Sequence, residues 1–368
     1  MKKKMYKRVV ALLCASVMVL SLTACQKTES TDTAADNQQA AETKEETGNS
    51  EPQTEETSAG DKKVYGYITP GPDTWYQRNV EGFQMGAEKA GYDVVVLNSD
   101  YDASKEVANI DAMINQGVDG VCIFSFNENG AKIAAEKFAE AGIPVVATDS
   151  CATALDAEQD IVAAIDFDWV EMGNNYAQWM ADNHAGENYV IITGNFESVP
   201  CQMINEAMTA KSEELAQNEC IDIREGKYDP SEAVNVAQDL ISSGKEFSII
   251  YVMNEDMAAA VVQMLENNNL LDQYTVIAQN GSPAGLPLIE NGKLSYTISS
   301  SPGWEGLVSF LVLDQYVTGS STAVEQAVML PIMPVDQENI NDESKVVPWE
   351  VNDIYWDLTN EYFPDLMK

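Results

Sequence analysis

Strand-length apolar runs alternate with segments of helical periodicity along most of the chain. The run at residues 64–69 (VYGYIT) leads to a helical stretch expected at 74–90, in which Val80, Phe83 and Ala87 share one face. Unbroken apolar strands, each followed by a helix, indicate parallel sheets covered by helices on both faces. The expected strands are residues 64–69, 92–98, 119–125, 143–149, 161–166, 189–194, 220–226, 247–253 and 274–280. This alternation predicts an α/β protein.

The ends of the expected helices carry capping residues. Gly91, Gly117 and Gly142 each follow a helix and precede a strand, where glycine can adopt the left-handed conformation of a C-cap. Asp168 stands where an N-cap is expected, at the start of a helix running to about His184. The expected helices are residues 74–90, 103–116, 128–141, 168–184, 202–217, 231–243 and 255–267.

The alternation falls into two series, and residues 62–368 are long enough for two domains of ordinary size. We therefore expect two doubly wound lobes, each built on its own parallel sheet. No GxGxxG follows the first strand and no P-loop occurs, so nucleotide binding lacks its sequence signal. In open α/β sheets a ligand lies beyond the carboxyl ends of the strands.

Aromatic and hydrogen-bonding residues recur directly after the expected strands. Aromatic faces can stack on the apolar C–H face of a sugar ring, while carboxylates and amides can bridge adjacent hydroxyls. One such residue could be a turn or core residue, but their recurrence at many strand ends favours a ligand site. The candidates are Asp73, Trp75, Tyr76, Ser125, Phe126 and Asp149 in the first half, and Gln202, Asn254 and Asn280 in the second.

The N-terminus predicts export. Five basic residues precede a short apolar run at residues 9–22, which is shorter than a membrane span. The run ends in Leu22-Thr23-Ala24-Cys25, which resembles the lipobox of bacterial lipoproteins. The resemblance implies a signal peptide at residues 1–24, lipidation of Cys25, and a protein held on the outer face of the cytoplasmic membrane. The alternative is an ordinary secretory signal with an incidental cysteine.

Residues 25–61 are expected to be a disordered acidic tether. After Cys25 this stretch contains no aromatic residue and no Val, Ile, Leu or Met, so it cannot bury enough surface to offset chain entropy. A spacer is the simplest interpretation, and an interaction tail is the alternative.

The charge balance limits the ligand and the partners. Without residues 1–24 the chain carries 16 basic and 59 acidic residues, a formal charge of −43. Such a field repels nucleic acid and phosphorylated ligands. Of the arginines only Arg78 and Arg224 lie beyond the signal, so a bidentate clamp for an anion is hard to assemble. A neutral or cationic ligand is expected, with no nucleic acid partner.

Metal, cofactor and catalytic motifs are lacking. The single histidine, His184, lies in a helical stretch, and no paired histidine or cysteine ligands or GxSxG elbow occur. Composition alone does not exclude a pair of catalytic carboxylates like that of a glycosidase. Four cysteines remain after Cys25, and a Cys151–Cys201 disulfide is one arrangement they would allow. We expect no cofactor, no metal and no enzyme activity.

Residues 62–335 resemble the type I periplasmic binding proteins of the ribose/galactose class, the solute receptors of ABC sugar importers. The resemblance rests on TWYQRNVEGFQMGAEKAGYDVVVLNSDYDASKEVANIDAMINQGVDGVCI, AEAGIPVVATDS, IIYVMNEDMAAAVVQML and VIAQNGSPAGLPLIENGKLSYTIS. It implies two lobes joined by a three-strand hinge, a small neutral sugar or polyol as ligand, and an ABC permease as partner.

The resemblance also implies roles for particular residues. The paired aromatics of the family match Trp75 and Tyr76, its polar loop matches Ser125 and Phe126, its sugar-bridging aspartate matches Asp149, and its later polar positions match Asn254, Asn280 and Ser300. The chain departs from ribose-type relatives at two arginine positions, which here are Ser150 and Gln202, and at a late aspartate, which is Asn280. These departures argue against ribose. The Asp149-Ser150 pair also resembles receptors of the furanone autoinducer.

In the family the chain crosses between the lobes three times. Placed on this sequence, one lobe comprises residues 62–167 plus 302–334, and the other comprises 168–301 plus 335–368. A repressor of the same fold would carry an N-terminal DNA-binding motif, but here a signal and a tether stand in that place. A receptor that presents its ligand to a membrane sensor kinase is the alternative to import.

Overall fold

The computed structural model describes residues 62–368 except residues 126, 150–160, 321–326 and 343. Its first sheet has six strands in the order β11-β5-β4-β3-β1-β2, and every pairing in it is parallel. The strands are β1 (Val64–Thr69), β2 (Asp93–Asn98), β3 (Gly120–Ile123), β4 (Val145–Thr148), β5 (Ala163–Phe167) and β11 (Ala327–Leu330). The last of these strands comes from near the end of the chain and pairs with β5.

The second sheet has four parallel strands in the order β7-β6-β8-β9. They are β6 (Tyr189–Thr193), β7 (Cys220–Glu225), β8 (Ile249–Val252) and β9 (Thr275–Ala278). A separate antiparallel pair joins β10 (Thr297–Ser299) to β12 (Met333–Val335). The predicted α/β class with parallel sheets is therefore confirmed.

Helices follow the strands as the sequence predicts. Gly91, Gly117 and Gly142 take the left-handed C-cap conformation, and the Asp168 carboxylate accepts a hydrogen bond from the backbone N–H of Glu171. The helices are α1 (Thr74–Ala90), α2 (Ala103–Gln116), α3 (Glu128–Ala141), α4 (Trp169–Asn183), α5 (Val199–Leu215), α6 (Pro230–Ser242), α7 (Glu255–Asn267), α8 (Leu286–Glu290), α9 (Pro302–Val317) and α10 (Ile354–Tyr362), with short 3-10 turns at Leu271–Gln273 and Pro364–Met367.

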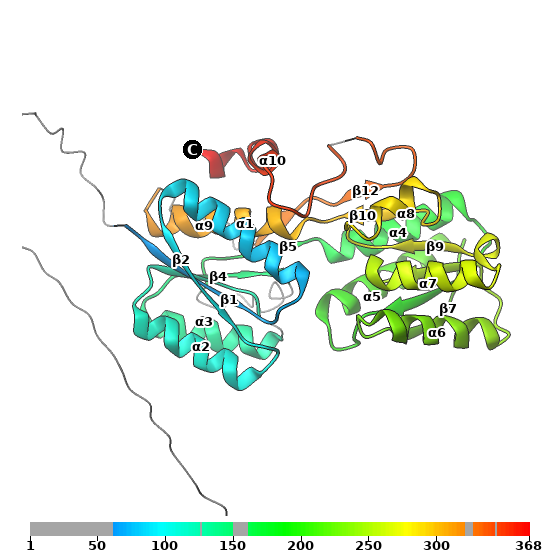
Figure 1. Cartoon of the computed structure of the whole chain (residues 1–368), viewed down its shortest axis with the longest axis horizontal. Coiled ribbons are helices and arrows are strands. Elements are labelled where there is room, and N and C mark those ends of the chain that lie inside the picture. The colour runs from blue at the N-terminus through cyan, green and yellow to red at the C-terminus, as the bar shows by residue number, and fades with distance from the viewer. Residues whose placement is uncertain (1–61, 126, 150–160, 321–326, 343) are drawn as a thin grey trace, which may run out of the picture. The chain divides into compact units, whose positions relative to one another are not determined.

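Each sheet is covered on both faces. In the first sheet, α1 and α9 lie on one face and α2 and α3 on the other (Figure 1). Strand β1 shows why: Tyr65 and Tyr67 pack into the core on the α1 side, while Ile68 packs with Ile110 and Met113 on the α2 side. Alternation of side chains along a strand allows both faces to be apolar.

Helices α1 and α9 approach unusually closely, although more than two hundred residues separate them in sequence. A Cβ atom built on Gly82 would lie 1.8 Å from the carbonyl oxygen of Gly303, and one on Gly306 would lie 1.9 Å from that of Asn79. Only glycine allows two helix backbones to come this near. The contact carries residues 302–317 into the helix layer of the first sheet.

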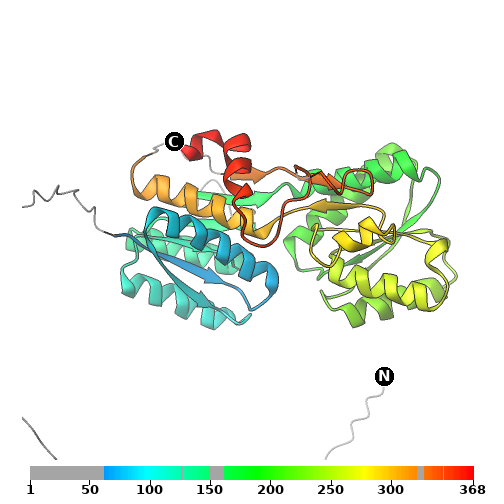
Figure 2. The same ribbon diagram turned by 45° about the horizontal axis from the view of Figure 1, so that its top comes forward.

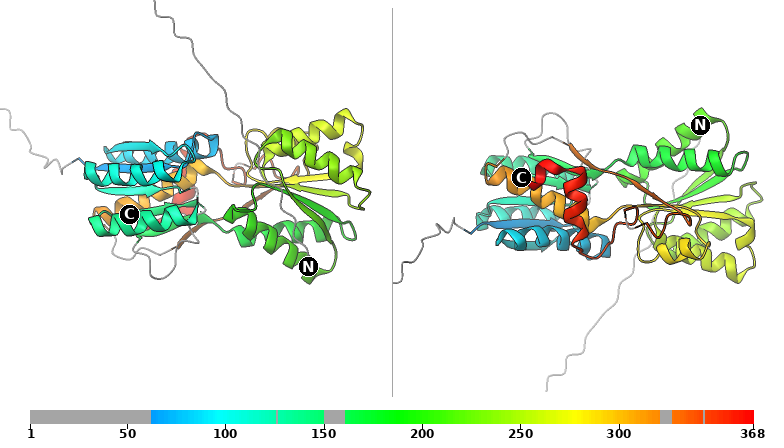
Figure 3. Two further views of the ribbon diagram at one scale, coloured as in Figure 1. Left: turned by 90° about the horizontal axis from the view of Figure 1, so that it is seen from below. Right: turned by 90° about the horizontal axis from the view of Figure 1, so that it is seen from above.

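The C-terminal helix α10 packs on α9. Figures 2 and 3 show it, in red, beside the orange α9. The Trp304 indole donates to Thr359 Oγ1 (3.0 Å), and the Lys89 ammonium of α1 lies over the Trp356 ring. Trp304 of α9 and Tyr355 of α10 are both buried. The division of the chain into lobes, with residues 335–368 in the second, stays a prediction.

No helix among the described residues is both long and apolar enough to cross a bilayer.

Candidate functional site

Trp75 and Asp149, both predicted from sequence, are bonded to each other. The indole Nε1–H of Trp75, in the first turn of α1, donates to Asp149 Oδ2 at 2.9 Å. Asp149 directly follows β4 and is buried, with a left-handed backbone (φ 60°). Asp73 caps α1 by accepting from the backbone N–H of Trp75 (2.9 Å), which fixes the start of that helix. The residues that follow β1 and β4 therefore lie side by side, as an aromatic ring hydrogen-bonded to a carboxylate.

Tyr76 lies beside this pair in an aromatic group. Its ring packs edge-on against Phe124 (centroids 4.8 Å apart) and against Tyr101 (6.2 Å apart). Burial raises the pKa of Tyr76 well above its ordinary value, with the charges of Tyr101 and Asp149 adding to the shift. The phenol therefore remains protonated and serves as a hydrogen-bond donor.

Ser125 and Phe126 are the other first-half candidates. Ser125 is fully buried, and its hydroxyl lies within hydrogen-bonding distance of two acceptors, Glu106 Oε1 (2.8 Å) and the carbonyl of Asn127 (2.9 Å). These bonds give Ser125 a part in shaping the loop after β3. Phe126 lies outside the described residues.

A buried acidic cluster, formed by Asp149, Asp166 and Glu305, supports the first half of the site. The backbone N–H of Asp149 donates to Glu305 Oε1 (3.0 Å), and the Asn79 amide donates to Glu305 Oε2 (2.8 Å). Burial and the neighbouring carboxylates raise the pKa of both Asp166 and Glu305 well above the ordinary values. Sequence reasoning missed both residues. Asp166 is an acidic residue within an otherwise apolar strand (AAIDF), and Glu305 is one within an otherwise apolar helix (PGWEGLVSFLVL). These two patterns were the sequence signals that could have identified them.

In the second half, Asn254 and Asn280 follow β8 and β9. The Asn254 side chain accepts from the backbone N–H of Met257 (2.9 Å) and caps α7. Asn280 has a positive φ (117°), and its carbonyl accepts from the Trp349 indole (3.2 Å) and from the backbone N–H of Ser300 (2.9 Å). Asn280 is half-buried.

Glu255, the first residue of α7, holds the loop that follows β9. Its carboxylate accepts from the backbone N–H groups of Gly281 (2.8 Å) and Ser282 (2.7 Å) and from the Thr297 hydroxyl (2.5 Å). Complete burial raises the pKa of Glu255 to about 7, against the lowering effect of these hydrogen bonds. Glu255 thereby fixes the loop that carries Asn280, and sequence reasoning gave it no such part.

Gln202 and Ser300 complete the predicted set. The Gln202 amide donates to the carbonyl of Phe196 (2.6 Å), which ties α5 to the loop after β6. Ser300 is buried, and its hydroxyl oxygen is among the described polar atoms that have no hydrogen-bond partner. A buried hydroxyl without a partner is a natural place for a ligand group to bind.

Trp349, which the sequence analysis did not select, links the two halves of the predicted set. Its ring packs edge-on against Trp75 (centroids 5.3 Å apart), and its Nε1–H donates to the carbonyl of Asn280. Asp149, Trp75, Trp349 and Asn280 thus form one continuous series of contacts. Trp349 lies in an irregular segment, so no pattern of apolar residues could predict its position.

Three large exposed side chains also follow strands: Tyr101 after β2, Phe196 after β6, and Tyr228 after β7. The Tyr228 hydroxyl lies 3.1 Å from both Ser198 Oγ and Cys201 Sγ. Cys201 is a free thiol, and its conceivable partner Cys151 lies outside the described residues. Within the described part of the chain, no group of His, Cys, Asp and Glu is placed to hold a metal ion.

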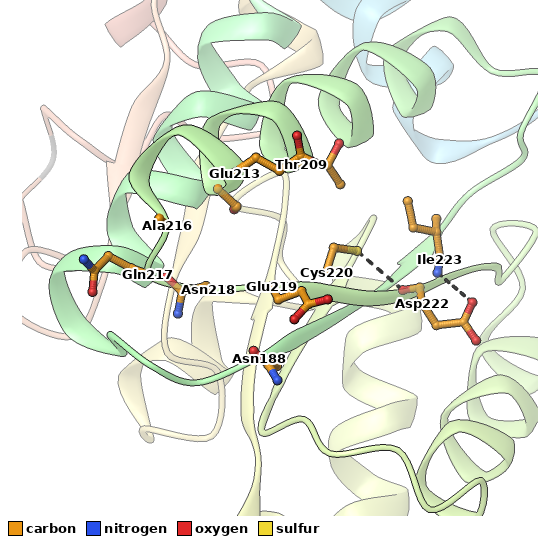
Figure 4. Close-up of a pocket in the computed structure, with 11 residues that line it drawn as sticks. Asn188, Thr209, Glu213, Ala216, Gln217, Asn218, Glu219, Cys220, Asp222 and Ile223 are labelled. Carbon is orange, nitrogen blue, oxygen red and sulfur yellow. Dashed lines mark hydrogen bonds between the residues drawn. The ribbon is translucent and has the colours of Figure 1, made fainter.

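One cavity of about 590 Å³ lies elsewhere in the molecule, between the end of α5 and β7 (Figure 4). Cys220, in its lining, is the first residue of β7, so the cavity lies toward the amino end of that strand. It is therefore separate from the predicted site, which gathers at the carboxyl ends of the strands.

Two doubly wound parallel sheets, with aromatic and acidic side chains at their carboxyl ends, define a type I periplasmic binding protein fold. The chain belongs to the family described as the periplasmic binding protein domain, which matches residues 65–321. The resemblance noted in the sequence is thereby confirmed.

Curated relatives cover most of the chain. It is 25% identical to the ribose import binding protein of Salmonella typhimurium, over 69% of this chain and 84% of the relative. It is 25% identical to the fructose import binding protein of Bifidobacterium longum, over 67% and 77%, and 24% identical to the xylitol-binding protein of Mycolicibacterium smegmatis, over 78% and 81%.

The fold is also found in solved structures. An ABC transporter solute binding protein from Bacillus halodurans C-125 with bound myo-inositol aligns with a TM-score of 0.71 at 21% identity, covering 77% of this chain and 98% of that one. A solute binding protein from Burkholderia graminis in complex with D-arabinose aligns with a TM-score of 0.69 at 17% identity, over 76% and 97%.

Proposed function

We propose that this protein is the extracytoplasmic solute-binding lipoprotein of an ABC importer, and that it captures a small neutral carbohydrate, a monosaccharide or a polyol. Its family, and relatives whose names describe ribose, fructose and xylitol binding, support the ligand class. The same names support import over presentation of a furanone to a sensor kinase.

The main structural support for a carbohydrate ligand is the hydrogen-bonded pair of Trp75 and Asp149. A carboxylate held by an indole N–H keeps a fixed orientation beside an apolar ring, which suits a sugar hydroxyl next to a C–H face. The hydroxyl groups of a bound sugar would then form hydrogen bonds with Asp149 and with the polar atoms around Asn254, Asn280 and Ser300. Lobe closure about the hinge would shield these bonds from water and strengthen them.

The arginines support a ligand without negative charge. Arg78 pairs with Glu81 (2.7 Å) and Glu350 (3.4 Å), and Arg224 pairs with Asp222 (2.9 Å). Neither guanidinium has the unpaired geometry that a carboxylate or phosphate clamp requires. The excess of acidic over basic residues in the chain adds a field that repels an anionic ligand.

The membrane anchor is a proposal from the sequence. Lipidation of Cys25 would tie the protein to the outer face of the cytoplasmic membrane, with residues 26–61 as the tether. Replacement of Cys25 by Ala should release the protein from the membrane fraction. Unchanged processing and membrane retention of that variant would contradict the anchor.

A ligand screen tests the function. The purified residues 62–368 should gain several degrees of melting temperature with at least one pentose, hexose, cyclitol or polyol, and calorimetry should give a one-to-one complex. Organic acids and sugar phosphates should have no effect, since both arginines in the described part of the chain are already paired with carboxylates. A protein stabilised by anions alone, or by no carbohydrate in the panel, would contradict the proposal.

A further inference from the structure

The two halves of the protein carry the same short segment after their second strands. Strand β2 is followed by Tyr101 in the sequence YDAS (101–104), and β7 is followed by Tyr228 in YDPS (228–231). In both, the aspartate after the tyrosine is the N-cap of the next helix. The repeat spans only four residues and is too short to be recognised from the sequence alone.

The backbone is also repeated. Asp100 and Tyr101 have φ angles of 49° and 57°, and Lys227 and Tyr228 have 57° and 56°. Two successive non-glycine residues in the left-handed region are uncommon, and the surrounding structure must hold them there. The turn is held by a hydrogen bond from the Tyr101 N–H to the Pro70 carbonyl (2.7 Å) and by one from the Asp102 N–H to the Ser99 carbonyl (2.9 Å).

Each tyrosine ring lies across a glycine that follows the first strand of its half. A Cβ atom built on Gly71 would lie 2.1 Å from Cζ of Tyr101, and one on Gly194 would lie 2.3 Å from Cζ of Tyr228. The glycines thus leave room for rings that lie flat on the backbone. Despite this support, Tyr101 remains 51% exposed and Tyr228 40% exposed.

The position of Tyr101 separates it from an ordinary surface tyrosine. It follows the carboxyl end of β2, on the edge of the first sheet where Trp75, Tyr76 and Asp149 gather, and its ring contacts that of Tyr76. Tyr316, on α9, is 47% exposed but stands near the opposite end of its helix from Glu305 and the acidic cluster. Single exposed tyrosines such as Tyr316 are common and need no ligand to explain them.

We propose that Tyr101 contacts the ligand and favours cyclic carbohydrates over open-chain polyols. The inference rests on the proposed function and deepens it. A ring fixed over Gly71, with one face exposed, offers a flat apolar surface beside Tyr76. A pyranose, furanose or cyclitol presents a rigid C–H face to such a surface, whereas an open-chain polyol must lose conformational freedom to present one.

Calorimetry with two ligand classes tests the inference. The wild type, Tyr101→Phe, Tyr101→Ala and the control Tyr316→Ala are titrated with D-ribose, D-xylose and myo-inositol, and with xylitol as the open-chain probe. Tyr101→Ala should weaken the best cyclic ligand about tenfold and xylitol by less than about threefold, so that selectivity falls. Tyr101→Phe should stay within about twofold of the wild type, and Tyr316→Ala should be unchanged.

Gly71→Ala gives an independent variant, because the new methyl group displaces the Tyr101 ring without removing it. It should weaken cyclic ligands in the same direction as Tyr101→Ala. Unchanged cyclic affinity in Tyr101→Ala, or an equal loss for both ligand classes, overturns the inference and leaves the proposed function standing. A wild type that binds no member of the panel overturns the proposed function and this inference together.

Discussion

Each half of the molecule has a buried glutamate at the start of a helix that holds the loop after a strand, but the two glutamates have different neighbours. Glu255 accepts hydrogen bonds from two backbone N–H groups and the Thr297 hydroxyl. Glu305 accepts from one backbone N–H and from the Asn79 amide, and it lies among other carboxylates. The second half is therefore held mainly by backbone donors, and the first in part by an amide side chain that can reorient.

The hydrogen-bond donors around the two glutamates differ in how freely they can reorient. Backbone donors cannot reorient, so the loop carrying Asn280 has one arrangement. An asparagine can exchange its donor and acceptor ends, and the Tyr67 hydroxyl that donates to Asn79 Oδ1 (2.7 Å) can rotate to accept instead. The donor and acceptor groups around Glu305 can thus be exchanged, whereas the backbone N–H groups around Glu255 cannot.

Removal of the Glu255 carboxylate should have the largest effect. Glu255→Ala leaves the N–H groups of Gly281 and Ser282 and the Thr297 hydroxyl buried without their acceptor, at a cost of about 1–3 kcal/mol each, so we expect a loss of about 3 kcal/mol or more. Urea unfolding at neutral pH measures the loss. Glu266→Ala, which removes the half-buried ion pair of α7 with Lys293, is the control and should cost less than about 1 kcal/mol. Equal losses in the two variants would remove the special role of Glu255.

The pH dependence of stability comes next. Burial raises the pKa of Glu255 from its ordinary 4.5 to about 7, so the folded protein holds a proton that the unfolded chain releases above pH 4.5. The contribution of Glu255 to stability is therefore fully present below about pH 4.5 and is lost as the pH rises through about 7, by about 3 kcal/mol at 1.36 kcal/mol for each pKa unit.

Glu255→Gln isolates this contribution, because glutamine does not titrate. Its unfolding free energy should change less between pH 5 and pH 8 than that of the wild type. The slope that remains belongs to Asp166 and Glu305, whose raised pKa values act with the same sign, and to the net negative charge. An identical slope in both proteins would show that Glu255 is ionised throughout.

Ligand binding should depend on the first half through Asp149. A carboxylate that accepts sugar hydroxyls makes bonds worth about 1.5–3 kcal/mol each, so Asp149→Ala should weaken binding at least about tenfold. Trp75→Ala should cost a comparable factor, since it removes both the stacking face and the N–H that orients Asp149. Asp239→Ala, an exposed position on α6, serves as the control in the same calorimetric titrations. A lower melting temperature with unchanged affinity would make Asp149 a turn residue.

The smallest effect is expected for Glu305→Gln. Because Asn79 can turn its amide and Tyr67 its hydroxyl, the network can accommodate the new N–H, and the change should cost less than about 1 kcal/mol. The same substitution at Glu255 places an N–H against a backbone N–H and should cost more. Comparison of the two glutamine variants by urea unfolding checks this, and a larger loss at Glu305 would reverse our account of the two halves.

Local features of the fold were predictable from sequence, and long-range ones were not. The strand–helix alternation, the caps at Gly91, Gly117 and Gly142, and the Asp168 N-cap all follow from residues close together in the chain. Trp75 and Asp149 were selected as separate ligand contacts, but their mutual hydrogen bond was not. Glu305 meets Asn79 across 226 positions, and no short sequence window contains both.

The C-terminal segment shows the same limit. Its path was not predicted, and Trp349 was not recognised as a link between Trp75 and Asn280. Irregular chain carries no periodicity from which a path can be calculated. The lobe boundaries and the ligand roles of the selected residues remain predictions for the experiments above.

The close contact between α1 and α9 sets an order of assembly. The second sheet uses β6 to β9, which lie within residues 189–278, so it can form from a continuous stretch of chain. The first sheet needs β11 and α9, whose partners stand more than 150 residues earlier, and such distant pairings form slowly. The first sheet therefore stays incomplete until residues 302–330 are present, and a chain cut short before residue 302 would lack α9 and β11 but keep all four strands of the second sheet.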